Sequence, residues 1–231
     1  MSAATPPPSE EHGRRAAGPP RRTGLGAVLS EDEFSVSDAI GGPRGILESV
    51  LPTLLFVVLF VATRSVKVAA LSAVAVVLVL LLARLVQRQS PGTVLGGLLG
   101  VALGAVLAIR SGDGTDFYWP GIVINGVSLA VLLLTLVLRR PLVGILVALL
   151  DPRVQDWQED PDARRVYARA TWLFAGLYAA KLAVQLPLLL TGQVAALGAA
   201  KLAMGLPAFA VLVYLVWLMH RALLGRRARR N

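Results

Sequence analysis

Five polar side chains that could bind a ligand or move a proton lie within long apolar stretches of the sequence. They are Glu48, Asn125, Ser128, Lys181 and Gln185. Ionisable and amide groups are costly in hydrocarbon, so such residues mark either contacts that join helices or a functional site. Lys181 and Gln185 are one helical turn apart and share a helix face. The set predicts an intramembrane polar cluster, in which Lys181 either joins helices or belongs to a binding or proton-relay site.

Depth in the bilayer determines which of these side chains can meet. If the helix that carries Lys181 enters from the cytoplasm, Lys181 lies about 15 Å deep and Gln185 about 21 Å deep. The preceding span runs the opposite way, which places Asn125 at the depth of Gln185. Ser128 lies close to the depth of Lys181 by the same count. We therefore expect the cluster to form between these two helices.

Glu48 is the only acid close to the apolar core and lies about one turn into the first span. Lys181 is about 10 Å deeper, and a lysine stem extends about 6 Å toward the surface. Direct pairing of the two residues would therefore need either a deeper position of Glu48 or a tilted helix. Two arginines are easier partners for this acid: Arg44 and Arg169.

The sequence contains no recognisable catalytic or metal-binding motif. There is no Cys, and the two histidines, His12 and His220, lie in the N-terminal tail and at the end of the last apolar stretch. No His lies beside a candidate Ser nucleophile, and no His-Glu-x-x-His zinc motif occurs. No glycine-rich phosphate loop follows a strand. We therefore expect no enzyme activity, no metal and no cofactor.

The helices that carry these residues can be predicted from composition. Of 231 residues, 55% are apolar and 16% are charged, and the mean hydropathy is +0.67. A helix needs about 20 mostly apolar residues to cross a bilayer. The expected fold is all-α, a polytopic membrane helix bundle with about six transmembrane helices. The expected spans are residues 46–63, 66–86, 93–109, 119–138, 170–190 and 202–219.

The remaining segments flank or interrupt a membrane bundle over residues 34–223. Residues 1–33 are rich in Pro, Gly, Arg and Glu and are expected to be a disordered cytoplasmic tail. Residues 224–231 form a short basic cytoplasmic tail. Residues 141–150 are apolar but too short to span, and follow an Arg-Arg-Pro break, so they are expected to be interfacial or re-entrant.

The cytoplasmic loop before the fifth span carries a helix-start signal. Asp160 precedes Pro161 and Asp162, which favours a helix that begins at Pro161 and continues unbroken into the membrane. Acidic and basic residues crowd this loop. The favoured interpretation is a solvated, salt-bridged surface and not a substrate site.

The basic residues indicate the orientation of the chain. With six spans, 18 of the 23 Lys and Arg residues fall on the side of the two termini. The positive-inside rule then places both termini in the cytoplasm of a bacterial cell, with the protein in the plasma membrane. Because of this distribution, the net charge of +9 predicts contact with anionic inner-leaflet lipids and no nucleic-acid binding. Four basic residues are expected on the outer side: Arg64, Lys67, Arg110 and Lys201.

Glycines recur every four residues in the third span. Small residues at this spacing make a smooth helix face that permits close helix approach in lipid. Internal helix packing is favoured over dimerisation of two copies. The residues of this face are Gly92, Gly96, Gly100 and Gly104.

Five motifs occur in an order that resembles a known family. They are "GGPRGILESVLPTLLFV", "FYWPGIVINGVSL", "RRPLVGILVALL", "RVYARATWLFAGLYAAKLAVQLPL" and "AALGAAKLAMGLP". Over about residues 35–223 the chain resembles an actinobacterial membrane family of unknown function, whose members are often labelled as similar to intracellular septation protein A. The resemblance implies an inner-membrane protein that affects division or envelope synthesis. It implies no reaction and supplies no catalytic residues.

Two hypotheses about function follow. The first is a non-enzymatic membrane component of the division or envelope machinery that acts through protein contacts. The second is a small carrier or channel-like protein that uses Lys181, Gln185 and Asn125. Transporters usually contain inverted repeats or paired broken helices, and we find no convincing repeat in the sequence. The partner, the substrate and the oligomeric state stay open.

Overall fold

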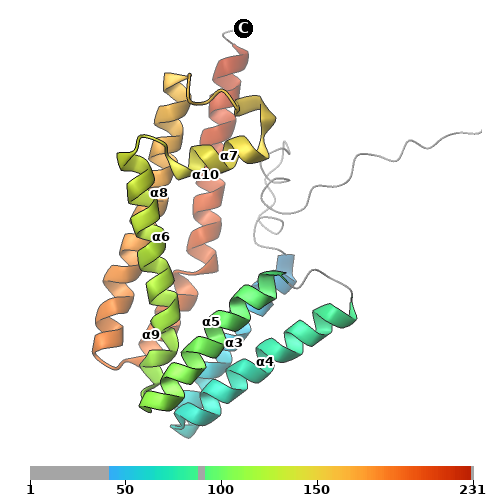
Figure 1. Ribbon diagram of the computed structural model, residues 1–231, viewed down its shortest axis with the longest axis vertical. Coiled ribbons are helices and arrows are strands. Elements are labelled where there is room, and N and C mark those ends of the chain that lie inside the picture. The colour runs from blue at the N-terminus through green and yellow to red at the C-terminus, as the bar shows by residue number, and fades with distance from the viewer. Residues whose placement is uncertain (1–41, 88–91, 230–231) are drawn as a thin grey trace, which may run out of the picture.

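The computed structural model describes residues 42–87 and 92–229 (Figure 1). Every regular element in these two ranges is a helix. Five helical segments are long and apolar enough to cross a membrane, whereas the apolar segment Gly96–Ser111 is shorter. The described chain is therefore an all-helical bundle of membrane type. The predicted tail over residues 1–33 lies outside the described residues.

The first three helices run side by side and are tilted together against the rest of the bundle (Figure 1). Small residues explain the close approach, because Ala69, Ala70 and Ala73 are fully buried on the middle helix. Ser65 begins that helix, where its hydroxyl accepts a hydrogen bond from the backbone of Val68. The three helices are α3 (Gly42–Thr63), α4 (Val66–Val86) and α5 (Gly92–Ser111).

A second group of helices stands upright in Figure 1. It contains α6 (Trp119–Val137), α8 (Pro161–Leu190), α9 (Val194–Ala203) and α10 (Leu206–Ala228). The helix start predicted at Pro161 is confirmed, since the Asp160 carboxylate accepts a hydrogen bond from the backbone of Asp162. At about 1.5 Å per residue, α8 is about 45 Å long.

The last predicted span differs from the structure at both ends. Residues 202–219 were expected to form one helix, but the chain breaks at Met204 and Gly205 between α9 and α10. Pro207, at the second position of α10, has no N–H to continue the helical hydrogen bonds, which favours a break at this point. At the other end, the expected basic tail is helical through Ala228.

The short helix α7 (Leu142–Leu150) covers the predicted interfacial segment. It runs crosswise to α6, α8 and α10 (Figure 1). The backbone of Val143 donates a hydrogen bond to the Thr171 hydroxyl, and Gly144 lies against the ring of Trp157, where an added Cβ would be 3.0 Å from the nearest ring atom. A 3₁₀ turn, η2 (Pro152–Val154), follows and leads into the loop before α8.

Two buried clusters hold the helices together at opposite ends of the bundle. One surrounds a 3₁₀ turn, η1 (Gly114–Tyr118), where Phe117 stacks on Phe56 of α3 with ring centroids 3.9 Å apart. The other joins α7 and its loop to α8 and α10 through Trp157 and Tyr167.

Candidate functional site

Three of the five predicted polar residues line one cavity within the bundle. Lys181 and Gln185 face it from α8 and Asn125 faces it from α6. The cavity has a volume of about 240 Å³. Gln185 is 4% exposed, so its amide is turned inward and not toward lipid. Lys181, Gln185 and Asn125, which the depth count in antiparallel helices predicts to lie near one another, thus line the same cavity.

A second lysine, Lys201 of α9, lines the same cavity. The sequence predicts this residue on the outer side, just before the sixth span, whereas the structure places it within a helix and in the cavity lining. Lys201 lies within helix α9, about 10 Å along the helix from Val194. Its Nζ atom is 5.3 Å from the ring centroid of Tyr118 and 5.7 Å from that of Phe117. The ammonium group therefore lies over aromatic faces inside the bundle.

Neither lysine has an anionic partner in the structure. Within residues 42–87 and 92–229, no ion pair or hydrogen bond is formed by the ammonium group of Lys181 or Lys201, and the cavity has no acidic residue among those that line it. Lys181 Nζ lies 4.9 Å from the ring centroid of Tyr178. Two lysines therefore share one cavity, whose other polar lining side chains are uncharged.

Tyr118 also lines this cavity and has a buried hydroxyl group. The residue is 1% exposed, and its hydroxyl has no hydrogen-bond partner among the described residues. Buried hydroxyls are nearly always paired, because an unpaired one costs about 1–3 kcal/mol. Tyr118 also lies close to the backbone of Gly198, where an added Cβ would be 2.9 Å from the hydroxyl. The phenol is held in place while its polar end stays unused.

The break between α9 and α10 places the N-terminus of α10, which carries a partial positive charge, beside the cavity. Gly205 and Leu206 line the cavity and form the start of α10, which has no side-chain cap. The first backbone N–H groups of a helix lack partners within the helix and carry a partial positive charge. An uncapped helix start beside two lysines is an electrostatic arrangement suited to an anion.

A short internal repeat in the sequence marks these two positions. Residues 179–187 are "AAKLAVQLP" and residues 199–207 are "AAKLAMGLP", identical at seven of nine positions. Because α8 and α9 run in opposite directions around the turn at Thr191 and Gly192, the two copies are antiparallel in space. The sequence analysis found no convincing repeat, and comparison of these two stretches would have identified Lys201.

The other two predicted residues lie elsewhere. Ser128 does not line this cavity. Glu48 pairs with Arg84 of α4, a partner that the sequence analysis did not consider, with Oε2 to Nη2 at 2.5 Å and Oε1 to Nε at 3.2 Å. This two-bond geometry neutralises the acid at the side of the bundle where α3 begins.

A larger cavity of about 600 Å³ adjoins the first one. Gly96, Gly97 and Gly100 of α5 line it, and a Cβ at any of the three would meet no atom within 4 Å. The structure therefore differs from the predicted packing face, since Gly96 and Gly100 face this space. Gly104 does approach another segment closely, at the backbone carbonyl of Phe117. The packing around Gly92, the first glycine of the predicted face, lies outside what the structure describes.

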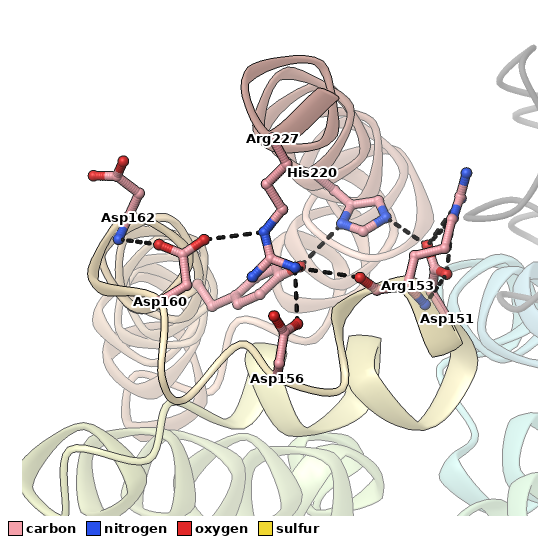
Figure 2. Close-up of polar contacts among 8 residues, drawn as sticks. Asp151, Arg153, Asp156, Asp160, Asp162, His220 and Arg227 are labelled. Atoms are coloured by element: carbon pink, nitrogen blue, oxygen red, sulfur yellow. Dashed lines mark hydrogen bonds and ion pairs between the residues drawn. The ribbon is translucent and has the colours of Figure 1, made fainter. Parts of the chain in front are cut away.

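A second polar cluster at the other end of the bundle joins α10 to the loop before α8 (Figure 2). His220 lies between two buried side chains, with Nε2 3.0 Å from Asp151 Oδ2 and Nδ1 3.0 Å from Tyr167 Oη. The three residues are 1%, 2% and 0% exposed. When Nε2 carries the proton and donates to the carboxylate, the Tyr167 hydroxyl donates to Nδ1, so every group is paired.

Arg227 extends this cluster toward the surface (Figure 2). It donates from Nε to Asp160 at 3.0 Å and from Nη1 to Asp156 at 2.8 Å. Burial raises the pKa of the Asp160 carboxyl, but hydrogen bonds from the backbone and from Arg227 outweigh burial and leave this pKa lowered. The sequence predicts a solvated, salt-bridged surface here. The ion pairs are present, but Arg227 and Asp160 are partly buried, and their network ties α10 to the loop.

No metal site accompanies these clusters in the described ranges. Residues 42–87 and 92–229 contain no group of three or more His, Cys, Asp or Glu side chains placed to hold an ion. The buried Asp151–His220–Tyr167 chain is closed to solvent and joins elements that are far apart in sequence. We interpret it as a structural contact and the lysine cavity as the candidate site.

The fold and the cavity define an all-helical bundle of membrane type with a polar cavity between its helices. The chain belongs to the family described as "Protein of unknown function (DUF3159)", whose model matches residues 40–226. No curated protein and no solved structure matches the chain.

Proposed function

We propose that this protein is a membrane-embedded binding protein of carrier type, and not an enzyme, which holds an anion between α6, α8 and the broken helix α9–α10. One observation carries the proposal: Lys181 and Lys201 line a single cavity that has no acidic lining residue. An ammonium group inside a membrane protein almost always pairs or faces a ligand pathway. Two of them in one cavity call for an anionic occupant.

The alternative role for Lys181, a contact that joins helices, has less support in the structure. A joining lysine would donate to a carboxylate or to carbonyl oxygens of a neighbouring helix. Its ammonium makes no such bond within the described ranges and lies against the face of Tyr178 on its own helix. The unused Tyr118 hydroxyl and the uncapped start of α10 add donors, which an anion accepts from and a cation does not.

The broken helix supports a carrier-type architecture. Many transporters place their substrate near the membrane midplane beside helices that are interrupted there. The antiparallel copies of the Lys-Leu-Ala-x-x-Leu-Pro motif give the two sides of the cavity related sequences, as internal inverted repeats do. This is the second of the two functional hypotheses from the sequence, extended by Lys201.

The proposal includes the orientation of the chain. We place the protein in a bacterial plasma membrane with α5 as a sixth span and both termini in the cytoplasm. The distribution of Lys and Arg supports this. The turns after α3 and α8 and the 3₁₀ turn η1 also lie together at the lower end of Figure 1, opposite α7 and the C-terminus.

Binding of simple phosphates by the purified full-length chain tests the proposal. In dodecyl maltoside, inorganic phosphate and dodecyl phosphate are titrated at constant ionic strength, with isothermal titration calorimetry as the readout. We expect saturable binding that falls at least about tenfold in Lys181→Gln and in Lys201→Gln, since each removes a charge from an apolar site. Lys67→Gln, at the exposed start of α4, is the matched control and should bind as the wild type does.

A lack of saturable binding for both probes would contradict the proposal. Equal binding by wild type, Lys181→Gln and Lys201→Gln would also contradict it. If a lysine variant does not fold, Tyr118→Phe provides a second test, because it removes only the unused hydroxyl. It should weaken binding without lowering the melting temperature.

The role in division or envelope synthesis is a separate proposal that depends on the sequence resemblance. It is compatible with an anion-binding membrane protein and adds a cellular consequence. Deletion of the gene followed by imaging of septa tests it, with misplaced or missing septa as the expected result. Normal septa and normal envelope resistance in the deletion strain would remove its support.

A further inference from the structure

We infer that the anion is the phosphate headgroup of an amphiphile whose hydrocarbon chain lies in the larger, glycine-walled cavity. This inference rests on the proposed anion-binding function and names the class of ligand. Three observations support it: the two cavities adjoin, the larger one is lined by glycines of α5, and the two lysines line the smaller one.

The two cavities adjoin, because six residues line both of them, and we place one ligand across this boundary. Lys201 stands at the junction, and the residues on either side of it are small or apolar. The shared lining residues are Ser49, Thr53, Gly121, Ile124, Lys201 and Leu206. The two cavities have volumes of about 240 and 600 Å³. Taken together, they fall within the range expected for ligand sites, about 300–1,000 Å³.

The larger cavity suits a hydrocarbon chain and not a second anion. Its charged lining residues other than Lys201 are Glu48 and Arg84, which neutralise one another by a two-bond ion pair. On the α5 side it is lined by Gly96, Gly97, Gly100 and Val101, and a Cβ at any of the three glycines would meet no atom within 4 Å. The hydrocarbon chain of a ligand could fill this space in place of lipid, and it would bury no unpaired charge there.

The smaller cavity suits a phosphate headgroup. Two ammonium groups face it without an acidic residue in its lining, so a group with about two negative charges balances the site. Tyr118, whose hydroxyl has no partner among the described residues, and the uncapped start of α10 also line this cavity. The unpaired Tyr118 hydroxyl is a second indication of a ligand, and it does not depend on the glycines of α5.

Comparison of two phosphates with the same charged group tests this inference. Inorganic phosphate and dodecyl phosphate are titrated into the full-length protein in dodecyl maltoside. We expect dodecyl phosphate to bind at least about tenfold more tightly, because its chain leaves water for an apolar cavity. Dodecyltrimethylammonium, which has the same chain and the opposite charge, controls for partition into the micelle and should not bind to the site.

Variants of the glycine wall locate the chain. Gly100→Leu fills the larger cavity and should reduce dodecyl phosphate binding to the level of inorganic phosphate, while inorganic phosphate binding stays unchanged. Gly97→Leu serves as the second variant if Gly100→Leu does not fold. Gly176→Leu, on α8 and also facing open space, is the matched control and should bind both phosphates as the wild type does.

The outcomes separate this inference from the function on which it rests. Equal affinity for the two phosphates, with lysine dependence retained, would overturn the amphiphile and leave anion binding intact; the ligand would then be a free phosphate. A different result would be that dodecyl phosphate binds more tightly than inorganic phosphate to the wild type and equally tightly to Gly100→Leu and Gly97→Leu. That result would place its hydrocarbon chain outside the larger cavity and overturn the inference. Failure of both probes to bind would remove the proposed function itself.

Discussion

Lys181 and Lys201 enter one cavity from consecutive helices that run in opposite directions, and each lies six residues before a proline. Proline removes a backbone N–H and disturbs the helix one turn before it. At Pro187 the helix α8 continues, whereas at Pro207 the chain breaks after Gly205 and begins α10 anew. The two copies of the motif therefore differ in whether the helix continues to the proline, and the break in the second copy places a helix start beside the lysines.

The glycines of α5 should divide into two classes when each is replaced by Ala. Gly104→Ala places a Cβ against the backbone carbonyl of Phe117, which cannot move as a side chain can. We expect the free energy of unfolding to fall by about 1–3 kcal/mol. Gly100→Ala meets open space and should raise it by up to about 1 kcal/mol, because Ala favours helix over Gly. Unfolding in SDS titrations measures both, and equal losses would contradict the observed packing.

Replacement of His220 should destabilise the loop before α8. His220→Leu leaves the buried carboxylate of Asp151 and the hydroxyl of Tyr167 each short of a partner, at a cost of about 2 kcal/mol. Tyr167→Phe removes one hydrogen bond and should cost about 1 kcal/mol. Arg165→Gln breaks only an exposed pair with Asp162 and should change stability by less than about 0.5 kcal/mol. A wild-type melting temperature for His220→Leu would show that the chain of hydrogen bonds is dispensable.

The same region should weaken in acid. Burial raises the pKa of the Asp151 carboxyl, but hydrogen bonds from Arg153 and His220 outweigh burial and lower the pKa, as Arg227 and the backbone do for Asp160. A carboxyl with a lowered folded pKa stabilises the protein fully above its unfolded pKa, about 3.9, and loses this contribution as the pH falls through the folded value. Melting temperatures from pH 6 down to about pH 3 should therefore fall, and Asp160→Asn should flatten this fall. A steeper fall in Asp160→Asn would reverse the sign and contradict the argument.

The ion pair between Glu48 and Arg84 should respond to charge exchange. Their side chains are 9% and 18% exposed, so Arg84→Gln leaves a largely buried carboxylate without this partner, at about 3 kcal/mol. The double variant Glu48→Arg with Arg84→Glu should recover part of that loss, since it restores the attraction. Arg110→Gln, an exposed arginine on α5, is the control and should be neutral. No recovery in the double variant would indicate that the pair does not set the stability.

Periodicity and local signals were sufficient to predict much of the fold. The apolar stretches predicted the helices, and Asp160 before Pro161 predicted the start of α8, because capping depends only on neighbouring residues. Depth counting along antiparallel spans also indicated that Lys181, Gln185 and Asn125 would share a space.

The contacts that were missed depend on distant residues or on one assumption about topology. Lys201 was placed in a loop because the apolar stretch was judged to begin one residue later, at Leu202. His220 and Asp151 are 69 residues apart in sequence, and no spacing rule predicts that they meet. The glycines of α5 were assigned to packing from their spacing alone, although the same pattern also produces the wall of a cavity.

Single-cysteine labelling should decide whether α5 crosses the membrane. The native chain has no Cys, so each introduced thiol is read without background. In intact cells, a membrane-impermeant maleimide should label Thr63→Cys, Ser111→Cys and Gln193→Cys, which are exposed at the expected outer ends of the helices. Gln87→Cys and Gln155→Cys should label only after the cells are opened. Labelling of Gln87→Cys together with Ser111→Cys in intact cells would mean that α5 does not cross. Labelling of Gln87→Cys and Gln155→Cys without the other three would show the reverse orientation.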